Sequence, residues 1–324
     1  MSLLSHAPNF SIVQAETLAA EVYGIAGHAT LLPSERDQNF LVATERGKFV
    51  LKIANALEQG ELLEGQNEVL VHLNNHITFC PRVIASQSGE LISRFDSESS
   101  SNWVRLVTFI PGRPLAKVEQ TPALLFDLGK KLGELRCALV GFDHDSFHRD
   151  FHWDLANGLR VVRQHGILLR DAKLRQEVEH FASCFQSSFS SQLVSLPRSV
   201  IHGDANDYNV IVENENVAGL IDYGDMVYSY TVGDLAVALA YVVLDKSDPL
   251  SSVREVIDGY LSKVSLNEIE LELLWPLTLM RLCMSVCMAA FQQQQNPDNE
   301  YLDISQQAIR NSLPELFAMG SPIL

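Results

Sequence analysis

Two short apolar runs around a polar loop constrain the fold of this chain more than any other feature. The first run, Ser199–Ile201, leads into the polar segment His202–Asn209, and the second, Val210–Val212, follows it directly. A third run, Val217–Ile221, ends at Asp222. Runs of this length bounded by Gly, Asn and Asp predict short β-strands whose connecting loops carry the polar residues.

The pattern of apolar residues changes part-way along the chain. Helical spacing at 11–23 and 60–75 first accompanies β-type runs at 39–43, 48–53, 82–85, 90–94 and 103–109, with a serine-rich turn at 97–101. After the break at Pro111–Pro114, helical spacing dominates at 121–140, 168–188, 231–246, 249–263, 268–293 and 300–317. We therefore expect an α+β protein with a small β-rich N-lobe (1–108) and a larger helical C-lobe (109–324).

Length and charge narrow the class of protein. With 324 residues, the chain exceeds the usual size of a single core, which favours two lobes. Its 24 basic and 40 acidic residues give a net charge of −16, and such a surface repels phosphate backbones and anionic lipid. We therefore expect neither a nucleic acid nor a membrane surface as a partner.

Cysteine usage and hydropathy indicate the compartment. The five cysteines are odd in number and form no CxxC pair, which is typical of a reducing compartment. The first residues lack the basic stretch and apolar core of a signal peptide. The longest apolar run, Leu235–Leu244, has about half of the ~20 residues that a membrane-spanning helix needs. We expect a cytoplasmic protein, and the oligomeric state stays open, with a homodimer among the alternatives.

Three residues in the polar loops have the order that phosphoryl transfer requires. Asp204 is followed five residues later by Asn209, and Asp222 follows a further hairpin and precedes Tyr223-Gly224. This order matches the kinase layout of an Asp, an Asn and a second Asp that hold the metal-bound phosphates and the acceptor. Mg²⁺ suits such a set of hard oxygen ligands. The alternative is that these are only turn residues, since turns also favour Asn, Asp and Gly.

The same motifs resemble the aminoglycoside phosphotransferase and choline kinase superfamily, which has a bilobal, protein-kinase-like fold. The resemblance rests on HGDANDYN (202–209), IDYGDM (221–226) and GDLA (233–236). It is closest to the hydroxylysine kinase group and to the kinase-like domain fused to class III aminotransferases, through LPSERDQNFLV (31–41), LLEGQN (62–67), TFIPGRPL (108–115) and FHWDLANG (151–158). The resemblance thus covers nearly the whole chain and both expected lobes.

This resemblance implies a role for each residue of the catalytic loops. Asp204 would be the catalytic base that orients and deprotonates an acceptor hydroxyl. Asn209 and Asp222 would hold Mg²⁺, with ATP or GTP as the phosphate donor. His202 would be structural and would brace the loop.

In the expected N-lobe, a single lysine interrupts an apolar strand. Lys52 lies in the run Phe49–Ile53, and the resemblance implies that it contacts the α- and β-phosphates of the nucleotide. The alternative is an edge-strand lysine exposed to water. Glu64 is our first choice for its acidic partner, while Gln66 and Glu68 stay open as alternatives.

The rest of the expected nucleotide site has a weaker sequence pattern. No glycine-rich loop precedes Lys52, so the loop that contains Ser34 is expected to meet the phosphates through backbone N–H groups and its hydroxyl. The base is expected to contact backbone near Thr108 and Ile110. Backbone contacts leave little signature in the sequence, so ATP and GTP are not distinguished.

Carboxylates and aromatic residues cluster in sequence around the catalytic loops. Asp207, Tyr223 and Asp225 are the nearest, and Trp153 and Asp154 are added by the FHWDLANG segment. Acidic and aromatic side chains suit an amine through ion pairing and cation–π contact. For the aromatic residues, packing beneath the loop is the alternative.

These observations predict an Mg²⁺-dependent small-molecule kinase. Its expected acceptor is the hydroxyl of a small amine-bearing metabolite of the hydroxylysine, homoserine, ethanolamine or choline class. One alternative is a kinase of aminoglycoside antibiotics. The other is a kinase-like module that binds a nucleotide or metabolite without turnover.

Overall fold

The computed structural model describes residues 8–34, 37–96, 101–295 and 305–319. The chain divides into two compact units, each treated separately below. The first comprises Met1–Pro111 with His144–Ser146, and the second comprises Gly112–Asp143 with Phe147–Leu324. Most of the serine-rich turn expected at 97–101 lies outside the described residues.

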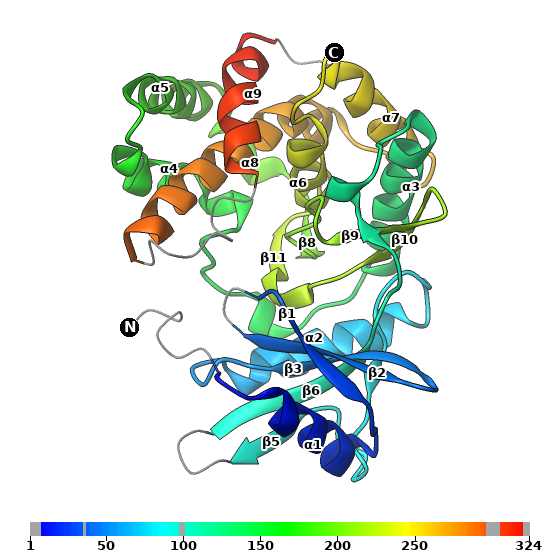
Figure 1. Cartoon of the computed structure of the whole chain (residues 1–324). Helices are drawn as coiled ribbons and strands as arrows, with labels where there is room; N and C mark the ends of the chain where they lie inside the picture. Colours follow the sequence, from blue (N-terminus) through cyan, green and yellow to red (C-terminus); the bar gives the residue numbers. More distant parts are fainter. Residues whose placement is uncertain (1–7, 35–36, 97–100, 296–304, 320–324) are drawn as a thin grey trace. The chain divides into compact units, whose positions relative to one another are not determined.

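The described part of the first unit is an antiparallel sheet with two helices (Figure 1). The strands pair in the order β1–β2–β3–β6–β4, and β5 also pairs with β6. The elements are α1 (Ile12–Tyr23), β1 (His28–Leu32), β2 (Gln38–Thr44), β3 (Gly47–Ile53), α2 (Gly60–Leu73), β4 (Val83–Ile84), β5 (Ser93–Asp96) and β6 (Ser101–Thr108). Strand β1 was not predicted, and the other elements lie close to their predicted positions.

The core of the first unit lies on one face of this sheet. Side chains alternate between the two faces of a strand, so every second residue of β2, β3 and β6 can be buried beneath α1. The buried cluster consists of Phe10, Ala15, Leu18, Ala19, Tyr23, Ala29, Phe40, Val42, Leu51, Ile53, Val104 and Leu106. The opposite face carries a row of polar residues, described below with the site.

The described part of the second unit is mainly helical and contains two small sheets. The strands are β7 (Arg113–Pro114), β8 (Arg198–Ile201), β9 (Val210–Glu213), β10 (Asn216–Leu220) and β11 (Val227–Tyr230). The helices are α3 (Pro122–Ala138), α4 (Gly158–His165), α5 (Ala172–Phe189), α6 (Gly233–Val242), α7 (Pro249–Leu261), α8 (Glu268–Gln295) and α9 (Gln306–Ala318). Helix α4 and strand β11 were not predicted. Arg113–Pro114, expected only as a break, pairs with β9.

Several helices begin at residues whose side chains cap them. Ser11 accepts a hydrogen bond from the N–H of Gln14 and forms a capping box at the start of α1. The side chains of Thr121, Asp171 and Asp248 likewise accept backbone N–H groups at the starts of α3, α5 and α7. A side-chain oxygen at this position satisfies an N–H group that has no partner within the helix.

The two small sheets position the catalytic loops. One has the order β10–β9–β7 and the other pairs β11 with β8, all antiparallel. Residues 202–209 connect β8 to β9, and residues 221–226 connect β10 to β11. Because Val210 pairs with Leu220, the two loops meet at the same end of the β9–β10 ladder.

Helix α8 is the central core helix of the second unit. By length and composition it is apolar enough to cross a membrane, but 94% of its most apolar window is buried inside the protein. Cys283 and Cys287 are both buried in it, and burial raises the pKa of both thiols. These features indicate a packing helix of a folded core.

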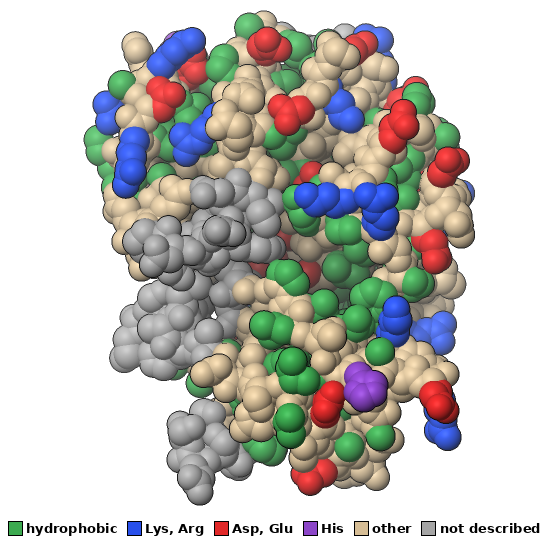
Figure 2. All heavy atoms as spheres, in the orientation of Figure 1, with side chains coloured by type: hydrophobic (Ala, Val, Ile, Leu, Met, Phe, Trp, Pro, Cys, Tyr) green, Lys and Arg blue, Asp and Glu red, His purple; other side chains and the backbone are tan. Residues whose placement is uncertain are grey.

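On the face drawn in Figure 2, acidic and basic side chains are interspersed. Basic side chains are not gathered there into one continuous patch. With the net charge of −16, this distribution does not favour binding of a polyanion to that face.

Helices α3 and α7 approach each other closely at glycines. A Cβ at Gly129 would lie 1.8 Å from the carbonyl oxygen of Val256. We predict that Gly129→Ala forces the two helices apart and lowers the free energy of unfolding by about 1–3 kcal/mol, as overpacking typically does. Thermal unfolding checks this. The control is Gly166→Ala, whose added Cβ would meet only Cys287 Sγ at 3.9 Å; equal melting temperatures for the two variants would contradict the prediction.

Candidate active site

A buried carboxylate anchors the loop between β8 and β9. Asp234, near the start of α6, accepts hydrogen bonds from the backbone N–H groups of His202 (3.1 Å) and Gly203 (2.8 Å). Burial raises the pKa of Asp234, while His202 and these two donors oppose the shift. Asp234 is the acidic residue of the GDLA motif, and the sequence analysis gave it no role.

The ring of His202 joins the two catalytic loops. Its Nε2 lies 3.1 Å from the carbonyl oxygen of Ile221, and its Nδ1 accepts the N–H of Asp204 at 3.2 Å. The ring is fully buried, and burial lowers its pKa. A neutral imidazole that donates through Nε2 and accepts through Nδ1 satisfies both contacts. This agrees with the structural role that the resemblance implied.

The residue between His202 and Asp204 must be glycine. Gly203 has φ of 80°, a backbone conformation that glycine adopts without strain. A Cβ at this position would also lie 2.6 Å from the carbonyl oxygen of Asp225. Gly203 therefore lets the two loops approach each other closely.

Both oxygens of the Asp204 carboxylate accept hydrogen bonds. Oδ2 accepts from the side-chain amides of Asn206 (2.9 Å) and Asn209 (2.8 Å). Oδ1 accepts from Nη2 of Arg281, on α8, at 2.6 Å. Burial raises the pKa of Asp204 to about 6, and the positive charge of Arg281 opposes this shift. A carboxylate with a raised pKa is a stronger proton acceptor than an ordinary one, which suits a general base.

Asn209 and Asp222 offer oxygens suited to a divalent cation. The amide nitrogen of Asn209 donates to Asp204 O (2.9 Å) and Oδ2, and its Oδ1 has no hydrogen-bond partner among the described residues. The backbone N–H of Ile221 donates to Asn209 O at 2.9 Å. Asp222 is the residue after Ile221, and it is exposed. An amide oxygen and a carboxylate are hard donors of the kind that Mg²⁺ prefers, so the residues fit this ion.

Asp207 carries a buried side-chain oxygen without a hydrogen-bond partner among the described residues. This oxygen is Oδ1, whereas the backbone carbonyl of Asp207 accepts the N–H of Ala116 at 2.9 Å. Burial raises the pKa of Asp207 to about 6, and the nearby Lys117 opposes this. A buried acceptor without a partner is costly, so a donor on a bound molecule would stabilise it.

Comparison with known proteins identifies the family. Residues 28–262 match the model of the phosphotransferase enzyme family. The chain belongs to this family. It is 31% identical to hydroxylysine kinase of Mus musculus over 348 residues, which cover 98% of this chain and 92% of that protein. The chain is therefore a small-molecule kinase, as the sequence motifs predicted.

Solved structures confirm the α+β, protein-kinase-like fold of this phosphotransferase. The microcompartment-associated aminopropanol kinase has a TM-score of 0.73 at 15% identity and covers 94% of this chain and 95% of its own. An amicoumacin kinase solved in complex with AMP-PNP, Ca²⁺ and Ami has a TM-score of 0.68 at 14% identity and covers 94% of each chain. The likeness supports a nucleotide donor and a divalent metal for the family.

In the first unit, Lys52 belongs to a row of polar residues on the face of the sheet opposite the α1 core. It pairs with Asn39 on β2 and with Arg105 on β6, and directly paired residues project from the same face. Arg105 is buried and donates to Gln66 and, at 3.3 Å, to Asn67, both on α2. Lys52 therefore projects from the face that α2 covers.

The candidate partners of Lys52 lie on different sides of α2. Gln66 is buried and bound to Arg105, whereas Glu64 and Glu68 are exposed. Oε2 of Glu68 lies 3.9 Å from Nε2 of His144. The pairing of Lys52 with Glu64 stays a prediction, and the buried position is occupied by an amide.

The loop that contains Ser34, which is predicted to contact the phosphates, is described only in part. Ser34 is exposed, and Glu35 and Arg36 lie outside the described residues. Asp37, which follows them, accepts the backbone N–H of Asn55 at 3.0 Å. Its carboxylate therefore has a structural contact within the first unit, and the role of Ser34 stays a prediction.

Backbone contacts limit which groups can meet the nucleotide base. Thr108 exchanges hydrogen bonds with Arg82, since its N–H donates to Arg82 O and its hydroxyl accepts the Arg82 N–H, both at 2.9 Å. The N–H of Phe109 donates to Lys48 O at 3.0 Å. Thr108 and Ile110 were both predicted to contact the base. The N–H of Thr108 already donates to Arg82, whereas the N–H of Ile110 has no backbone partner among the described residues.

Trp153 and Asp154 are neighbours in sequence but have different surroundings. The Trp153 ring centre lies 4.6 Å from the guanidinium carbon of Arg281, which contacts the Asp204 carboxylate. Asp154 is buried and accepts hydrogen bonds from the Ala156 N–H (2.9 Å) and the Ser229 hydroxyl. Its carboxylate thus holds the following turn to β11, and we leave Asp154 out of the acceptor site proposed below.

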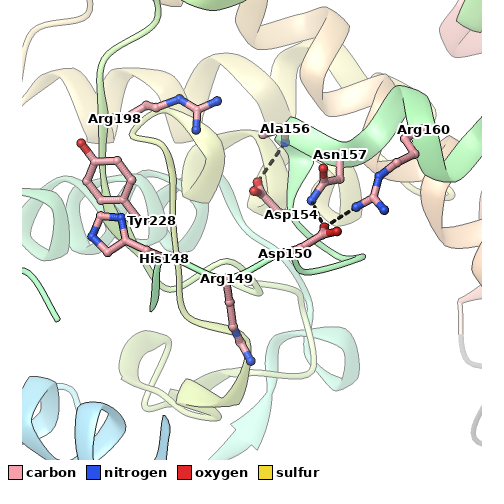
Figure 3. A pocket seen from close by; sticks show the side chains of 9 residues that line it. All are labelled: His148, Arg149, Asp150, Asp154, Ala156, Asn157, Arg160, Arg198 and Tyr228. Carbon is pink, nitrogen blue, oxygen red and sulfur yellow. Dashed lines mark hydrogen bonds and ion pairs between the residues drawn. The ribbon is translucent and has the colours of Figure 1, made fainter. Parts of the chain in front are cut away.

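Asp154 lines a separate cavity of about 570 Å³ (Figure 3). Its lining residues are His148, Arg149, Asp150, Asp154, Ala156, Asn157, Arg160, Arg198 and Tyr228. Their charged groups are largely paired within the protein: Asp150 with Arg160 and Asn157, and His148 with Asp143 at 2.8 Å. Figure 3 shows Arg160 and Asn157 converging on Asp150. These pairs stabilise the wall of the cavity.

The last two predicted acceptor residues differ in exposure. Tyr223 is buried, and its ring meets that of His202 edge-on, with centres 4.6 Å apart. This position favours the packing role that the sequence left open. Asp225 is partly exposed, and its charge contributes to the raised pKa of Asp204, so it belongs to the same acidic cluster.

Arg281, which contacts Asp204, is among the residues of this site that sequence reasoning missed, together with Asp234 and Asn206. Arg281 lies in the apolar part of α8, where the neighbouring residues have the pattern of a buried packing helix. The available signal was the charge itself, because a lone arginine in an apolar helix needs a partner when it is buried.

Proposed function

We propose that this kinase transfers the terminal phosphate of ATP or GTP to the hydroxyl of a small amine-bearing metabolite. The observation that carries the proposal is the braced Asp204 carboxylate beside the Asn209 and Asp222 oxygens. The near full-length similarity to hydroxylysine kinase supports the metabolite class, with homoserine, ethanolamine and choline as related candidates. The five free cysteines support a reducing, cytoplasmic compartment.

Each residue of the proposed donor side has a separate task. Asn209 and Asp222 would hold Mg²⁺, which supplies neutralising charge for the phosphates when bound. Lys52 would bind the α- and β-phosphates, and the N–H of Ile110 would donate to the base. Ser34 would contribute its hydroxyl to the phosphates.

On the acceptor side, acidic residues would bind the amine. The buried Oδ1 of Asp207 and the carboxylate of Asp225 would accept its N–H groups, and the face of Trp153 would flank it. The hydroxyl of the same molecule would then reach Asp204. An acceptor that carries both groups is thereby selected over a simple alcohol.

An acceptor screen tests this function. The purified protein is given Mg²⁺, ATP or GTP, and hydroxylysine, homoserine, ethanolamine, choline or aminoglycosides, and release of ADP or GDP is measured. We expect an amino alcohol of the metabolite class to give the highest kcat/KM. Faster turnover of aminoglycosides would instead support the antibiotic kinase, and no turnover with any acceptor would contradict the proposal.

Matched analogues identify the groups that are recognised. Lysine lacks the hydroxyl of hydroxylysine, so it should stimulate no nucleotide turnover. An alcohol without the amine should show a strongly raised KM, because Asp207 would then be left without a donor.

A further inference from the structure

Arg281 is an unusual residue for the position that it occupies. Its side chain is 3% exposed, and it lies among apolar residues of α8. Burying a guanidinium is costly unless charged and hydrogen-bonded partners compensate for the lost water. The partners of Arg281 therefore indicate why the charge is retained there.

Those partners are the Asp204 carboxylate and two aromatic residues, Trp153 and Tyr241. Nη2 donates to Asp204 Oδ1 at 2.6 Å, and Nη1 donates to the carbonyl oxygen of Trp153 at 3.3 Å. The guanidinium carbon also lies over the Trp153 ring, 4.6 Å from its centre, and the Tyr241 ring centre lies 6.0 Å away. A guanidinium held by contacts to its edge and its face has little freedom to rotate, so it fixes the position of Asp204 Oδ1.

The other oxygen of Asp204 is fixed by its own loop. Asn206 Oδ1 accepts the N–H groups of Tyr208 (2.8 Å) and Asn209 (3.0 Å), so its amide nitrogen must face Asp204. That nitrogen and Nδ2 of Asn209 both donate to Oδ2. A carboxylate has about four lone-pair sites, two on each oxygen. Both sites of Oδ2 are thus used, and one site of Oδ1 is left beside Arg281.

We infer that Arg281 is a positioning residue, which holds Asp204 so that Oδ1 receives the proton of the acceptor hydroxyl. This inference rests on the proposed function. The hydroxyl O–H bond breaks and its proton moves to Oδ1. The acceptor oxygen keeps the electron pair and forms a bond to the terminal phosphorus, whose bond to the nucleoside diphosphate breaks.

An alternative role for Arg281, binding a carboxylate of the acceptor, predicts a different outcome and can be tested at the same time. If Arg281 instead bound a carboxylate on the acceptor, its loss would raise the KM of amino acids such as hydroxylysine. It would leave the KM of carboxylate-free ethanolamine unchanged. A positioning role lowers kcat for both kinds of acceptor, since both depend on Asp204.

The experiment compares Arg281→Met, Asp204→Asn and the double variant. Misplacing a catalytic group by about 1 Å can cost about 10²-fold, so we expect Arg281→Met to lower kcat by about that factor with little change in acceptor KM. In the double variant no carboxylate remains to be positioned. Its kcat should therefore equal that of Asp204→Asn alone, a non-additivity typical of residues that act as one unit.

Arg136→Met is the matched control for the loss of a buried ion pair. Arg136 on α3 is partly buried; it pairs with the buried Glu270 of α8 at 2.9 Å and donates to the Tyr260 hydroxyl at 3.2 Å. We expect this variant to lose thermal stability but to keep its kcat. External guanidinium at low, non-denaturing concentration should restore part of the activity of Arg281→Ala and none in Asp204→Asn.

The outcomes separate this inference from the proposed function. Wild-type kcat in Arg281→Met, or losses that multiply in the double variant, would overturn the positioning role. If the wild type phosphorylates none of the amino alcohols, the acceptor proposal fails. The same variants can then be compared by nucleotide hydrolysis, in which water replaces the acceptor hydroxyl.

Discussion

Replacing Asp204 with asparagine is expected to lower kcat by a factor of about 10²–10⁴, the usual contribution of a general base. The substitution keeps the shape of the side chain and removes the charge that accepts the proton. Nucleotide affinity should change little, because Lys52 and the metal site contact the phosphates. Steady-state kinetics and nucleotide titration measure the two effects separately.

Asp207→Asn is the internal control, since Asp207 is the neighbouring carboxylate with a similarly raised pKa of about 6. In our assignment Asp207 binds the amine, so its loss should mainly raise the acceptor KM. Near wild-type turnover in Asp204→Asn, with none in Asp207→Asn, would show that the general base has been assigned to the wrong residue.

The second large effect concerns the metal site. We expect Asp222→Ala to weaken binding of the Mg²⁺–nucleotide complex by at least about tenfold, because even residues that only support metal ligands contribute about 10–100-fold. Binding of nucleotide without Mg²⁺ should change much less. Calorimetric titration with and without Mg²⁺ distinguishes these two quantities.

Glu213→Gln controls for loss of a carboxylate from the same hairpin. Glu213 is exposed at the far end of β9, away from Asn209. The Glu213→Gln variant should bind the Mg²⁺–nucleotide complex as tightly as the wild type does. Unchanged binding and turnover in Asp222→Ala would show that Asp222 is not a metal ligand.

The catalytic loops could be predicted from sequence because their order is local. Asp204 and Asn209 lie in the loop between β8 and β9, and Asp222 follows the β9–β10 hairpin. The β-type runs at 39–43 and 48–53 likewise predicted strands β2 and β3, the second of which carries Lys52. Such features depend on short-range spacing, which a single sequence contains.

Contacts between distant segments could not be predicted in the same way. Arg281 and Asp204 are 77 residues apart, and nothing in the apolar pattern of α8 specifies its partner. The break at Pro111–Pro114 could be predicted from sequence, but the pairing of Arg113–Pro114 with β9 depends on tertiary packing. The capping role of Asp154 is local and could have been recognised from its position before the Leu155–Asn157 turn.

The most direct test of the central claim is to identify the phosphorylated product. Wild-type protein is incubated with Mg²⁺, nucleoside triphosphate and the best amino alcohol from the screen, and the product is examined by phosphorus NMR and mass spectrometry. Our account predicts one phosphate ester on the acceptor oxygen, formed in step with nucleoside diphosphate and lost in Asp204→Asn. Formation of inorganic phosphate alone, or of phosphate bound to the amine nitrogen, would contradict it.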